Sequence, residues 1–398
     1  MDKDHFRQTL RQSPFYPCLE KHNRLGSWAS WNGYLTPRLL DTGASEYFAV
    51  RSSCSVMDLT PMEKYRISGP DALKFLNRLV TRDVSRLQQD RVSYVLWCND
   101  EGKVLDDGTL FRLGENEYRL CSMHHQLDWL MLSSLGMDVS IEQETDEIAA
   151  LAVQGPTSCS VLMEAGIGDL HQLKPFHLMY SRINGLEVMV SRTGFTGDLG
   201  YELWTDPASA QALWDALFEV KQRGLYDIRA IGLDALNRVR IEAGLLIPGD
   251  DFNTADSAIR ADRVRSPFEL GLGWAVNFDK PYFTGKRALL DEKQKPLRRR
   301  IVKLVVGGNK DCANAYLYNA RQGRRIGAIK SCTWSPIFKR NLALADIEFD
   351  NGAAPTAIWA EIHYQIELEW RSKWVECEIS DKPFWKHERR SQTPPARF

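Results

Sequence analysis

The segment that decides how this chain is interpreted is VSYVLWCNDEGKVLDDGTLFR, residues 92–112. Residues 92–98 are rich in aromatic and β-branched side chains, a turn follows at residues 99–102, and strand-like alternation resumes at residues 109–112. The segment therefore predicts a β-hairpin that carries four acidic residues within eight positions.

Two of these acidic residues, Asp106 and Asp107, are adjacent. Neighbouring residues of a strand point to opposite faces, so only one of the two carboxylates can normally face a pocket. A metal site would need several oxygens around one ion, and Asp100 lies too far around the turn for that to be assumed. Taken alone, the pattern favours a solvated acidic turn, because acidic residues are common in turns.

A second cluster is SRTGFTGDLGYE, residues 191–202. Its three glycines, spaced by three, permit a tight backbone path, and Glu202 resumes a strand after it. A carboxylate can accept two N–H donors side by side, which suits an amino-pyrimidinone edge. The cluster lacks the Lys of a phosphate-binding Walker loop. By pattern alone, a structural glycine turn is favoured over a binding loop.

A third cluster lies on a helix predicted at residues 232–242. Arg238 and Glu242 are four residues apart there, so a surface ion pair is the simplest interpretation. An inward-facing Arg would instead hold a carboxylate or phosphate. Hydrolase chemistry is not indicated, because no GxSxG motif occurs and His124-His125 lies in a helix-like segment without an evident nucleophile.

The pattern of elements changes along the chain. Strands and helices alternate up to residue 290, and residues 291–296 are charged and apolar-poor, as in a linker. Short strands then follow at residues 301–306, 325–330, 343–349, 358–366 and 374–379. Such spacing predicts a small antiparallel barrel or sandwich. We expect a two-lobed region at 1–290, a C-terminal domain at 297–385 and a surface tail at 386–398.

Composition excludes several classes of protein. The 398 residues include 51 Lys and Arg against 52 Asp and Glu, so no net field attracts polyanions and nucleic acid is not the expected partner. No apolar run approaches the roughly 18 residues of a membrane helix. Residues 1–11 lack the apolar core of a secretory signal, which favours a cytoplasmic location. The eight cysteines form no CxxC pair, so no metal site is expected.

Taken in order, these clusters resemble the aminomethyltransferase family, whose members include the glycine cleavage T-protein and dimethylsulfoniopropionate demethylase. Family members show an Asn, a Gly shortly after it and an Asp-Asp pair that begins four residues beyond that Gly. In this chain these residues are Asn99, Gly102, Asp106 and Asp107. Further matches cover nearly the whole chain, including residues 13–16, 57–62, 69–72, 242–244, 266–269, 283–286 and 334–336.

The resemblance implies an α+β, three-lobed aminomethyltransferase fold with a C-terminal antiparallel β-barrel, and tetrahydrofolate as the cofactor. The second Asp of the family pair is catalytic, which maps to Asp107. Tyr94 matches a folate-contacting tyrosine, and Glu202 matches the glutamate that holds the pterin. Arg240 matches the second Arg of the family pattern Ala-Arg-Asp-x-Leu-Arg, which makes it a candidate folate contact.

Two departures from the glycine cleavage pattern affect the expected reaction. Phe195 stands where many members have Tyr, so the ring is kept and the hydroxyl contact is lost. Leu236 replaces the first Arg of the Ala-Arg-Asp pattern. The resemblance therefore points to the family's demethylase branches.

The function expected from the resemblance is that of a tetrahydrofolate-dependent methyltransferase (demethylase). It would take a one-carbon group from a small methylated amine, sulfonium or ether, and no lipoylated carrier protein is expected. The alternatives are a glycine cleavage T-protein (aminomethyltransferase) and a non-enzymatic folate-binding regulator. Trp97, Phe195 and Trp204 are candidates for a cation-binding aromatic wall, with a core role as the other interpretation.

Overall fold

The predicted hairpin is present in the computed structural model, which describes residues 9–392 and 394. Its strands are β5 (Arg91–Cys98) and β6 (Val104–Arg112), which pair antiparallel with a bulge near Cys98. Strand β6 begins at Val104, earlier than predicted, so Asp106 and Asp107 lie within the strand rather than in the turn.

The hairpin belongs to a five-stranded antiparallel sheet in the order β5-β6-β7-β4-β8. The other strands are β4 (Glu63–Ser68), β7 (Glu117–Ser122) and β8 (Ser140–Gln143). Helices α3 (Ala72–Leu79) and α4 (Leu127–Ser133) cover one face, where Phe75, Leu76 and Leu130 pack on Trp97 and Leu120. Helical spacing of the α3 leucines, against two-residue alternation in the strands, lets both elements bury apolar side chains on the same side.

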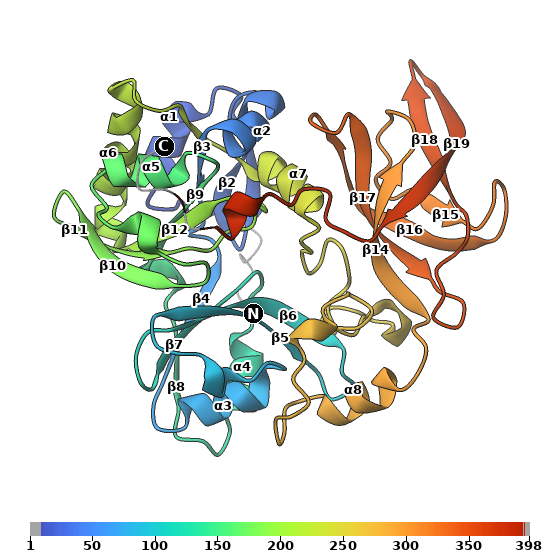
Figure 1. The fold of residues 1–398 in the computed structure, drawn as a ribbon, viewed down its shortest axis with the longest axis horizontal. Helices are drawn as coiled ribbons and strands as arrows, with labels where there is room; N and C mark the ends of the chain where they lie inside the picture. Colours follow the sequence, from blue (N-terminus) through green and yellow to red (C-terminus); the bar gives the residue numbers. More distant parts are fainter. Residues whose placement is uncertain (1–8, 393, 395–398) are drawn as a thin grey trace.

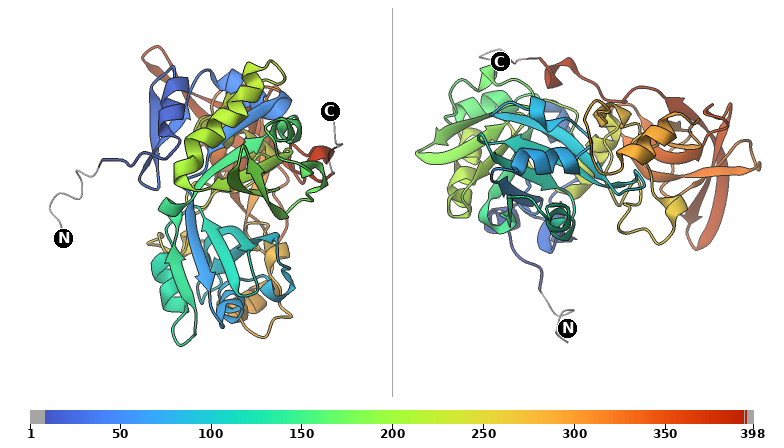
Figure 2. Two further views of the ribbon diagram at one scale, coloured as in Figure 1. Left: turned by 90° about the vertical axis from the view of Figure 1, so that its left-hand side faces the viewer. Right: turned by 90° about the horizontal axis from the view of Figure 1, so that it is seen from below.

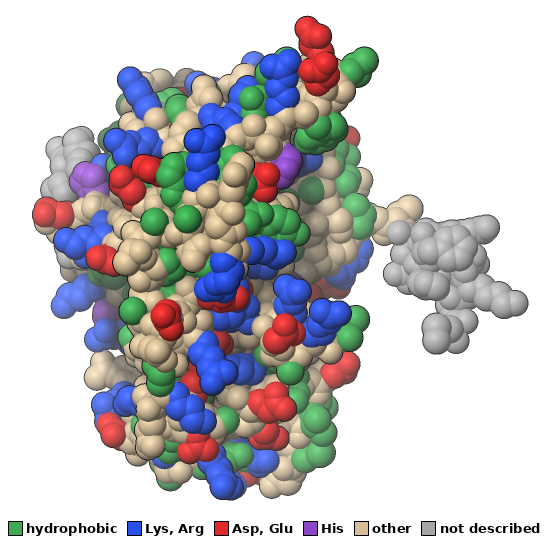
Figure 3. Space-filling model, turned by 90° about the vertical axis from the view of Figure 1, so that its right-hand side faces the viewer, with side chains coloured by type: hydrophobic (Ala, Val, Ile, Leu, Met, Phe, Trp, Pro, Cys, Tyr) green, Lys and Arg blue, Asp and Glu red, His purple; other side chains and the backbone are tan. Residues whose placement is uncertain are grey.

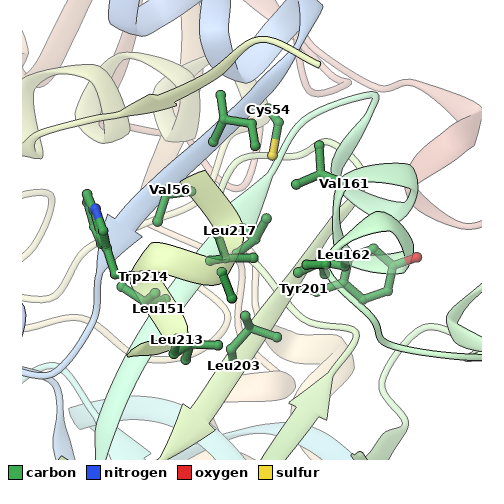
Figure 4. Packing of buried hydrophobic residues seen from close by; sticks show 14 of the residues in the cluster. Cys54, Val56, Leu151, Val161, Leu162, Tyr201, Leu203, Leu213, Trp214 and Leu217 are labelled. Carbon is green, nitrogen blue, oxygen red and sulfur yellow. The ribbon is translucent and has the colours of Figure 1, made fainter. Parts of the chain in front are cut away.

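A six-stranded sheet, in the order β10-β11-β12-β9-β3-β13, forms a second layer (Figure 1). Its strands are β3 (Cys54–Asp58), β9 (Ala149–Gln154), β10 (Leu178–Ile183), β11 (Leu186–Ser191), β12 (Gly200–Thr205) and β13 (Ile228–Ala230). Helices α5 (Ser158–Glu164) and α6 (Ala210–Gln222) cover its outer face. Figure 4 shows the packing there, with Trp214 and Leu217 of α6 against Val56, Leu151 and Leu203 of the strands.

The inner faces of the two sheets share one apolar core. Phe111 of β6 meets Trp204 of β12 edge to face, with ring centroids 5.2 Å apart. Along β6, Asp107 lies on the same face as Phe111, and along β12, Glu202 lies on the same face as Trp204, because both pairs are separated by an even number of residues. Asp107 and Glu202 therefore lie on the two sheet faces that this core joins.

The last lobe is a closed six-stranded antiparallel barrel in the order β14-β17-β16-β15-β18-β19. Its strands are β14 (Arg299–Val306), β15 (Tyr316–Tyr318), β16 (Arg325–Ser335), β17 (Arg340–Glu348), β18 (Ile358–Ile366) and β19 (Glu369–Ser380). All five predicted strands are present, and the choice left open between barrel and sandwich is resolved as a barrel. Figure 2 shows the barrel at one end of the molecule and the six-stranded sheet at the other.

The remaining elements connect these lobes. They are α1 (Tyr16–His22), the hairpin β1 (Ser27–Trp31) and β2 (Tyr34–Leu39), α2 (Gly43–Ser52), α7 (Leu233–Ala243) and α8 (Lys286–Lys293). The linker predicted at 291–296 is partly wrong, because α8 continues to Lys293. Residues 383–392 run from the barrel back to the six-stranded sheet (Figure 1), and within the predicted tail residues 386–392 are exposed except for the partly buried Arg389. The predicted domain limits 1–290, 297–385 and 386–398 stay a prediction.

No helix in residues 9–392 is long and apolar enough to cross a membrane. On the face shown in Figure 3, Lys and Arg side chains lie next to Asp and Glu side chains, as the balanced composition suggests.

Candidate active site

Asp107 and Tyr94 form the centre of the candidate site. They face the same side of the β5–β6 hairpin, and the Tyr94 hydroxyl donates a hydrogen bond to Asp107 Oδ2. The Tyr94 ring stacks on Trp274, with centroids 5.6 Å apart, and Trp274 is 63% exposed. Arg82 donates to the Tyr94 carbonyl oxygen and lies over the Trp274 ring. An aromatic pair therefore borders the carboxyl group and leads from it to solvent.

The pKa of the Asp107 carboxyl group lies near neutral pH. Burial of its carboxyl group and the negative charge of Asp106 raise the pKa of Asp107 to about 7, whereas the hydrogen bond from Tyr94 acts in the opposite direction. Burial and the Asp107 charge raise the pKa of Tyr94 well above its usual value. The tyrosine therefore stays a hydroxyl donor while Asp107 can gain or lose a proton near neutral pH.

Asp106 is fully buried and has different partners from Asp107. Its Oδ1 accepts from the Asp107 backbone N–H (2.8 Å) and its Oδ2 from the His124 backbone N–H (3.2 Å). Burial raises the pKa of Asp106, although His124 lowers it. His124 lies in the turn before α4, not in a helix as predicted, and the strand register explains its place. Because Gly108 pairs with Ser122, Asp106 and His124 fall opposite each other just beyond the paired residues.

Glu202 occupies the facing sheet. Its Oε2 accepts hydrogen bonds from Thr193 (2.5 Å) and Ser191 (3.5 Å), and Trp204 Nε1 donates to Ser191 Oγ (3.2 Å). Burial raises the pKa of Glu202 to about 7, because the two hydroxyl groups offset only part of the desolvation. Among the described residues, no hydrogen bond reaches Oε1, which leaves that oxygen available to a donor from a ligand.

The three glycines of residues 194–200 have structural roles. A Cβ at Gly194 or Gly200 would lie 2.1 Å from Gln154 Oε1. Gly197 has a φ of +73°, and its Cβ would lie 2.5 Å from the Ala243 Cβ. The Gln154 amide donates to the Thr193 carbonyl oxygen (3.2 Å) and thereby fixes the segment that presents Thr193 to Glu202. The structural interpretation of this turn is thus correct, and it also orients Glu202.

Among the described residues, no hydrogen bond or ion pair joins the other predicted site residues, Phe195 and Arg240, to Asp107. Phe195 is partly exposed in the glycine turn. Arg240 is fully buried, and its guanidinium donates to Asn237 (2.9 Å), Ser331 (2.9 Å) and Asp251. These protein groups occupy it in the described structure, so its role as a folate contact stays a prediction, as do the roles of Tyr94, Phe195, Glu202 and Asp107.

Two of the three proposed aromatic-wall residues belong to the core. Trp97 is fully buried under α3, and Trp204 is buried between the sheets. Trp274, which the sequence did not single out, is the aromatic side chain that borders the site. Its signal is weak, because a single tryptophan that follows Gly271 and Gly273 has no periodicity that would separate a surface ring from a core ring.

The surface ion pair expected between Arg238 and Glu242 is wrong. Glu242 is fully buried and pairs with Arg51 of α2 at 2.7 Å, and it also accepts from Tyr47 (2.7 Å) and Ser335 (2.5 Å). Trp385 packs over the Arg51 guanidinium at 4.3 Å. The pair therefore joins α2, α7, the barrel and the C-terminal segment. Its partners are 191 residues apart, so local spacing could not reveal it.

Open hollows lie beside the site rather than at its centre. One of about 710 Å³ is lined by Arg119, Tyr180 and Trp204 at the outer end of the inter-sheet core. Another, of about 360 Å³, is lined by Arg82 and Ser93 on the Tyr94 side. Neither lining includes Asp107 or Glu202. Among the described residues, no group of three or more His, Cys, Asp and Glu side chains could hold a metal ion.

Comparisons with known proteins agree with this architecture. Residues 21–280 match the GCVT N-terminal domain, and residues 299–386 match the glycine cleavage T-protein C-terminal barrel domain. The aminomethyltransferase of Caldanaerobacter subterraneus is 32% identical over 383 residues, covering 95% of this chain and 96% of that protein. The aminomethyltransferase of Alkaliphilus metalliredigens is 30% identical over 386 residues, covering 95% and 98%.

A solved structure gives the same result. The glycine cleavage system aminomethyltransferase T of Bartonella henselae superposes with a TM-score of 0.82 at 25% identity, covering 95% of this chain and 98% of that one. The expected α+β aminomethyltransferase fold with its C-terminal barrel is thereby confirmed. The chain belongs to the glycine cleavage T-protein family, whose one-carbon acceptor is tetrahydrofolate.

Proposed function

We propose that this member of the glycine cleavage T-protein family transfers a one-carbon group from a small donor to tetrahydrofolate, with Asp107 as its catalytic residue. The observation that supports this most directly is the contact between Tyr94 and Asp107, on a sheet face that meets the face of Glu202. Cytoplasmic location, expected from the sequence, is part of the proposal.

The residues present suit the folate. Glu202 is a buried carboxylate with one oxygen satisfied by Thr193 and Ser191 and the other without a protein donor among the described residues. An acceptor oxygen without a protein donor is open to a ligand donor, and the amino-pyrimidinone edge of a pterin offers two N–H groups side by side. Glu202 would hold that edge, and Tyr94 and Phe195 would border the ring.

Asp107 supplies the proton chemistry of the proposed reaction. Bound tetrahydrofolate supplies the nitrogen that accepts the one-carbon unit. With a pKa of about 7, Asp107 holds a proton in part of the molecules at neutral pH and a charge in the rest. The charged form stabilises a cationic donor, and the protonated form can donate to a leaving group. The Tyr94 hydroxyl, which donates to Oδ2, would orient the carboxyl group.

Two donor classes are compatible with this site. The names of the relatives support an aminomethyl donor, so aminomethyl transfer is the first candidate. The second candidate is demethylation of a small methylated amine, sulfonium or ether. Two residues favour it. Leu236 packs on the inter-sheet core at the position where glycine cleavage T-proteins usually have Arg, and Phe195 stands where many family members have Tyr. The comparisons lend no support to the expectation that a lipoylated carrier is dispensable.

A donor panel with two matched variants tests the proposal. The protein is incubated with tetrahydrofolate and methylated amines, sulfoniums or aryl ethers, or with an aminomethyl-loaded lipoylated carrier, and 5-methyl and 5,10-methylene products are separated by chromatography. Asp107→Asn should lower turnover at least about 100-fold while tetrahydrofolate binding is kept. Asp100→Asn, which alters an exposed acid of the same hairpin, should behave as the wild type.

Each result has a distinct meaning. Product only with the carrier identifies an aminomethyltransferase, and product from a free methylated donor identifies a demethylase. Folate binding without turnover of any donor would contradict the enzymatic proposal and leave a folate-binding regulator. Turnover that Asp107→Asn does not change would overturn the assignment of Asp107.

A further inference from the structure

The turn between β7 and α4 brings an unassigned histidine to the buried neighbour of Asp107. His124 donates its backbone N–H to Asp106 Oδ2, and its ring Nδ1 lies 3.6 Å from the same oxygen. Asp106 Oδ1 accepts from the Asp107 backbone N–H at 2.8 Å. One buried carboxylate thus links the histidine to the backbone of the candidate catalytic residue.

The His124 ring has one buried edge and one edge near solvent. Its Nδ1 is buried without a hydrogen-bond partner among the described residues, whereas its side chain as a whole is 41% exposed. A Cβ at Gly249 would lie 3.3 Å from Nε2, so the glycine leaves room for that edge of the ring. The charged groups that face His124 are Asp106 and Asp107 on β6 and Asp256 in the connection between α7 and α8.

The electrostatics of this arrangement favour a charged histidine. The interaction with Asp106 raises the pKa of His124 above its usual value despite partial burial of the ring. A buried carboxylate without a cation is costly, and His124, whose Nδ1 lies 3.6 Å from Asp106 Oδ2, can supply the positive charge. Because the same positive charge acts on Asp107, His124 offsets part of the repulsion between the two carboxylates.

We propose that His124 is a positioning residue for Asp107: paired with Asp106, it holds the β6 carboxylates in place and sets the pH range in which Asp107 is charged. This inference rests on the proposed function, because Asp107 is the catalytic residue there. His124 itself does not need to touch the substrate.

The first test measures the histidine directly and requires no donor. In protein labelled with ¹³C at histidine Cε1, the His124 resonance is assigned from its loss in His124→Gln and followed by NMR against pH. We expect it to titrate above the usual value near 6.5, and Asp106→Asn should lower its midpoint by about one pH unit. Asp107→Asn should lower it by a smaller amount, because coupling between two titrating groups is reciprocal.

The second test measures turnover against pH with the donor identified in the panel above. His124→Gln removes the positive charge, so ionised Asp107 becomes less favourable and the acid limb of the profile should move to higher pH by about half a unit or more. Asp106→Asn removes the neighbouring negative charge and should move the limb to lower pH. His125→Gln is the matched control, since His125 faces Glu63 at 3.8 Å instead of Asp106.

The outcomes separate this inference from the proposed function. A His124 midpoint near 6.5 that neither Asp106→Asn nor Asp107→Asn changes would overturn the inference, as would an acid limb that His124→Gln leaves in place. If no donor is turned over, the proposed function fails and the NMR titration alone decides on the pair. If His124→Gln does not fold, the resonance is assigned from its loss in His124→Asn instead, and the Asp106→Asn and Asp107→Asn titrations still decide.

Discussion

Removal of the negative charge at Glu242 tests how much the buried contact between α2 and α7 contributes to stability. The side chains of Arg51 and Glu242 are both 0% exposed and lie 2.7 Å apart. Glu242→Gln preserves shape and leaves an acceptor for Tyr47 and Ser335, but within the described part of the chain the Arg51 guanidinium then has no carboxylate partner except Asp198 at 3.7 Å. Breaking a buried ion pair by removing one partner costs about 3–5 kcal/mol.

The prediction is measured by urea unfolding, followed by tryptophan fluorescence and far-ultraviolet circular dichroism. With a slope near the upper end of the usual range, about 3 kcal/mol per molar, the midpoint should fall by about 1 M or more. The matched control is Glu187→Gln, which breaks the Arg182 pair at 2.8 Å on an exposed hairpin, with side chains 70% and 82% exposed. Such a pair contributes about 0–1 kcal/mol.

The comparison of the two variants decides the matter. If Glu242→Gln is no less stable than Glu187→Gln, at unchanged slopes, then burial does not make the Arg51 pair important and the reasoning is refuted. If the two optical signals no longer coincide in Glu242→Gln, the lobes unfold separately, which would itself identify the pair as the connection between them.

Three further predictions concern other parts of the structure. Burial raises the pKa of Glu202 to about 7, so between pH 4.5 and 7 the folded protein keeps a proton on Glu202 that the unfolded chain has released. The free energy of unfolding should therefore fall by about 3 kcal/mol over this pH range through Glu202. Urea unfolding of Glu202→Gln, measured at the same pH values, should lack that loss. In Gly108→Ala, the new Cβ would lie 1.9 Å from the Cys121 carbonyl oxygen, so β6 and β7 must separate. We expect a loss of about 1–3 kcal/mol of stability together with reduced turnover. A thermal unfolding midpoint that calorimetry finds unchanged would contradict this. Arg389→Ala removes two hydrogen bonds (2.5 and 2.8 Å) from the buried Asp198, and the thermal midpoint should fall by several degrees, corresponding to about 1–3 kcal/mol; an unaltered midpoint would mean that the C-terminal segment is not stabilising.

Local pattern predicted the elements but not the contacts between them. Residues 92–98 and the later strands of the barrel alternate clearly enough to be placed within a few residues. The onset of β6 at Val104 was missed because a bulge near Cys98 interrupts the alternation there. Asp107 was distinguished from the other acids of the hairpin by family resemblance and not by spacing.

The candidate site was predicted only where its residues belong to a known motif. Glu202 was singled out in this way, whereas Thr193, which donates to it, was interpreted only as part of a structural glycine turn. His124 could have been found from the register of β6 and β7, had β7 been predicted. The ion pair between Arg51 and Glu242 could not be predicted from local sequence, because Arg238, four residues before Glu242 on the same helix, was the simpler partner.

The order of the strands has a consequence for synthesis of the chain. The five-stranded sheet, residues 63–143, is inserted between β3 and β9 of the six-stranded sheet, and its first and last strands, β4 and β8, are neighbours. All its pairing partners have therefore been translated by residue 143, and it can close on the ribosome while β3 still waits for β9 and β13. Trp385 and Arg389 are translated later still. The nascent chain thus completes the β5–β6 hairpin well before the contacts of Trp385 and Arg389 around Arg51.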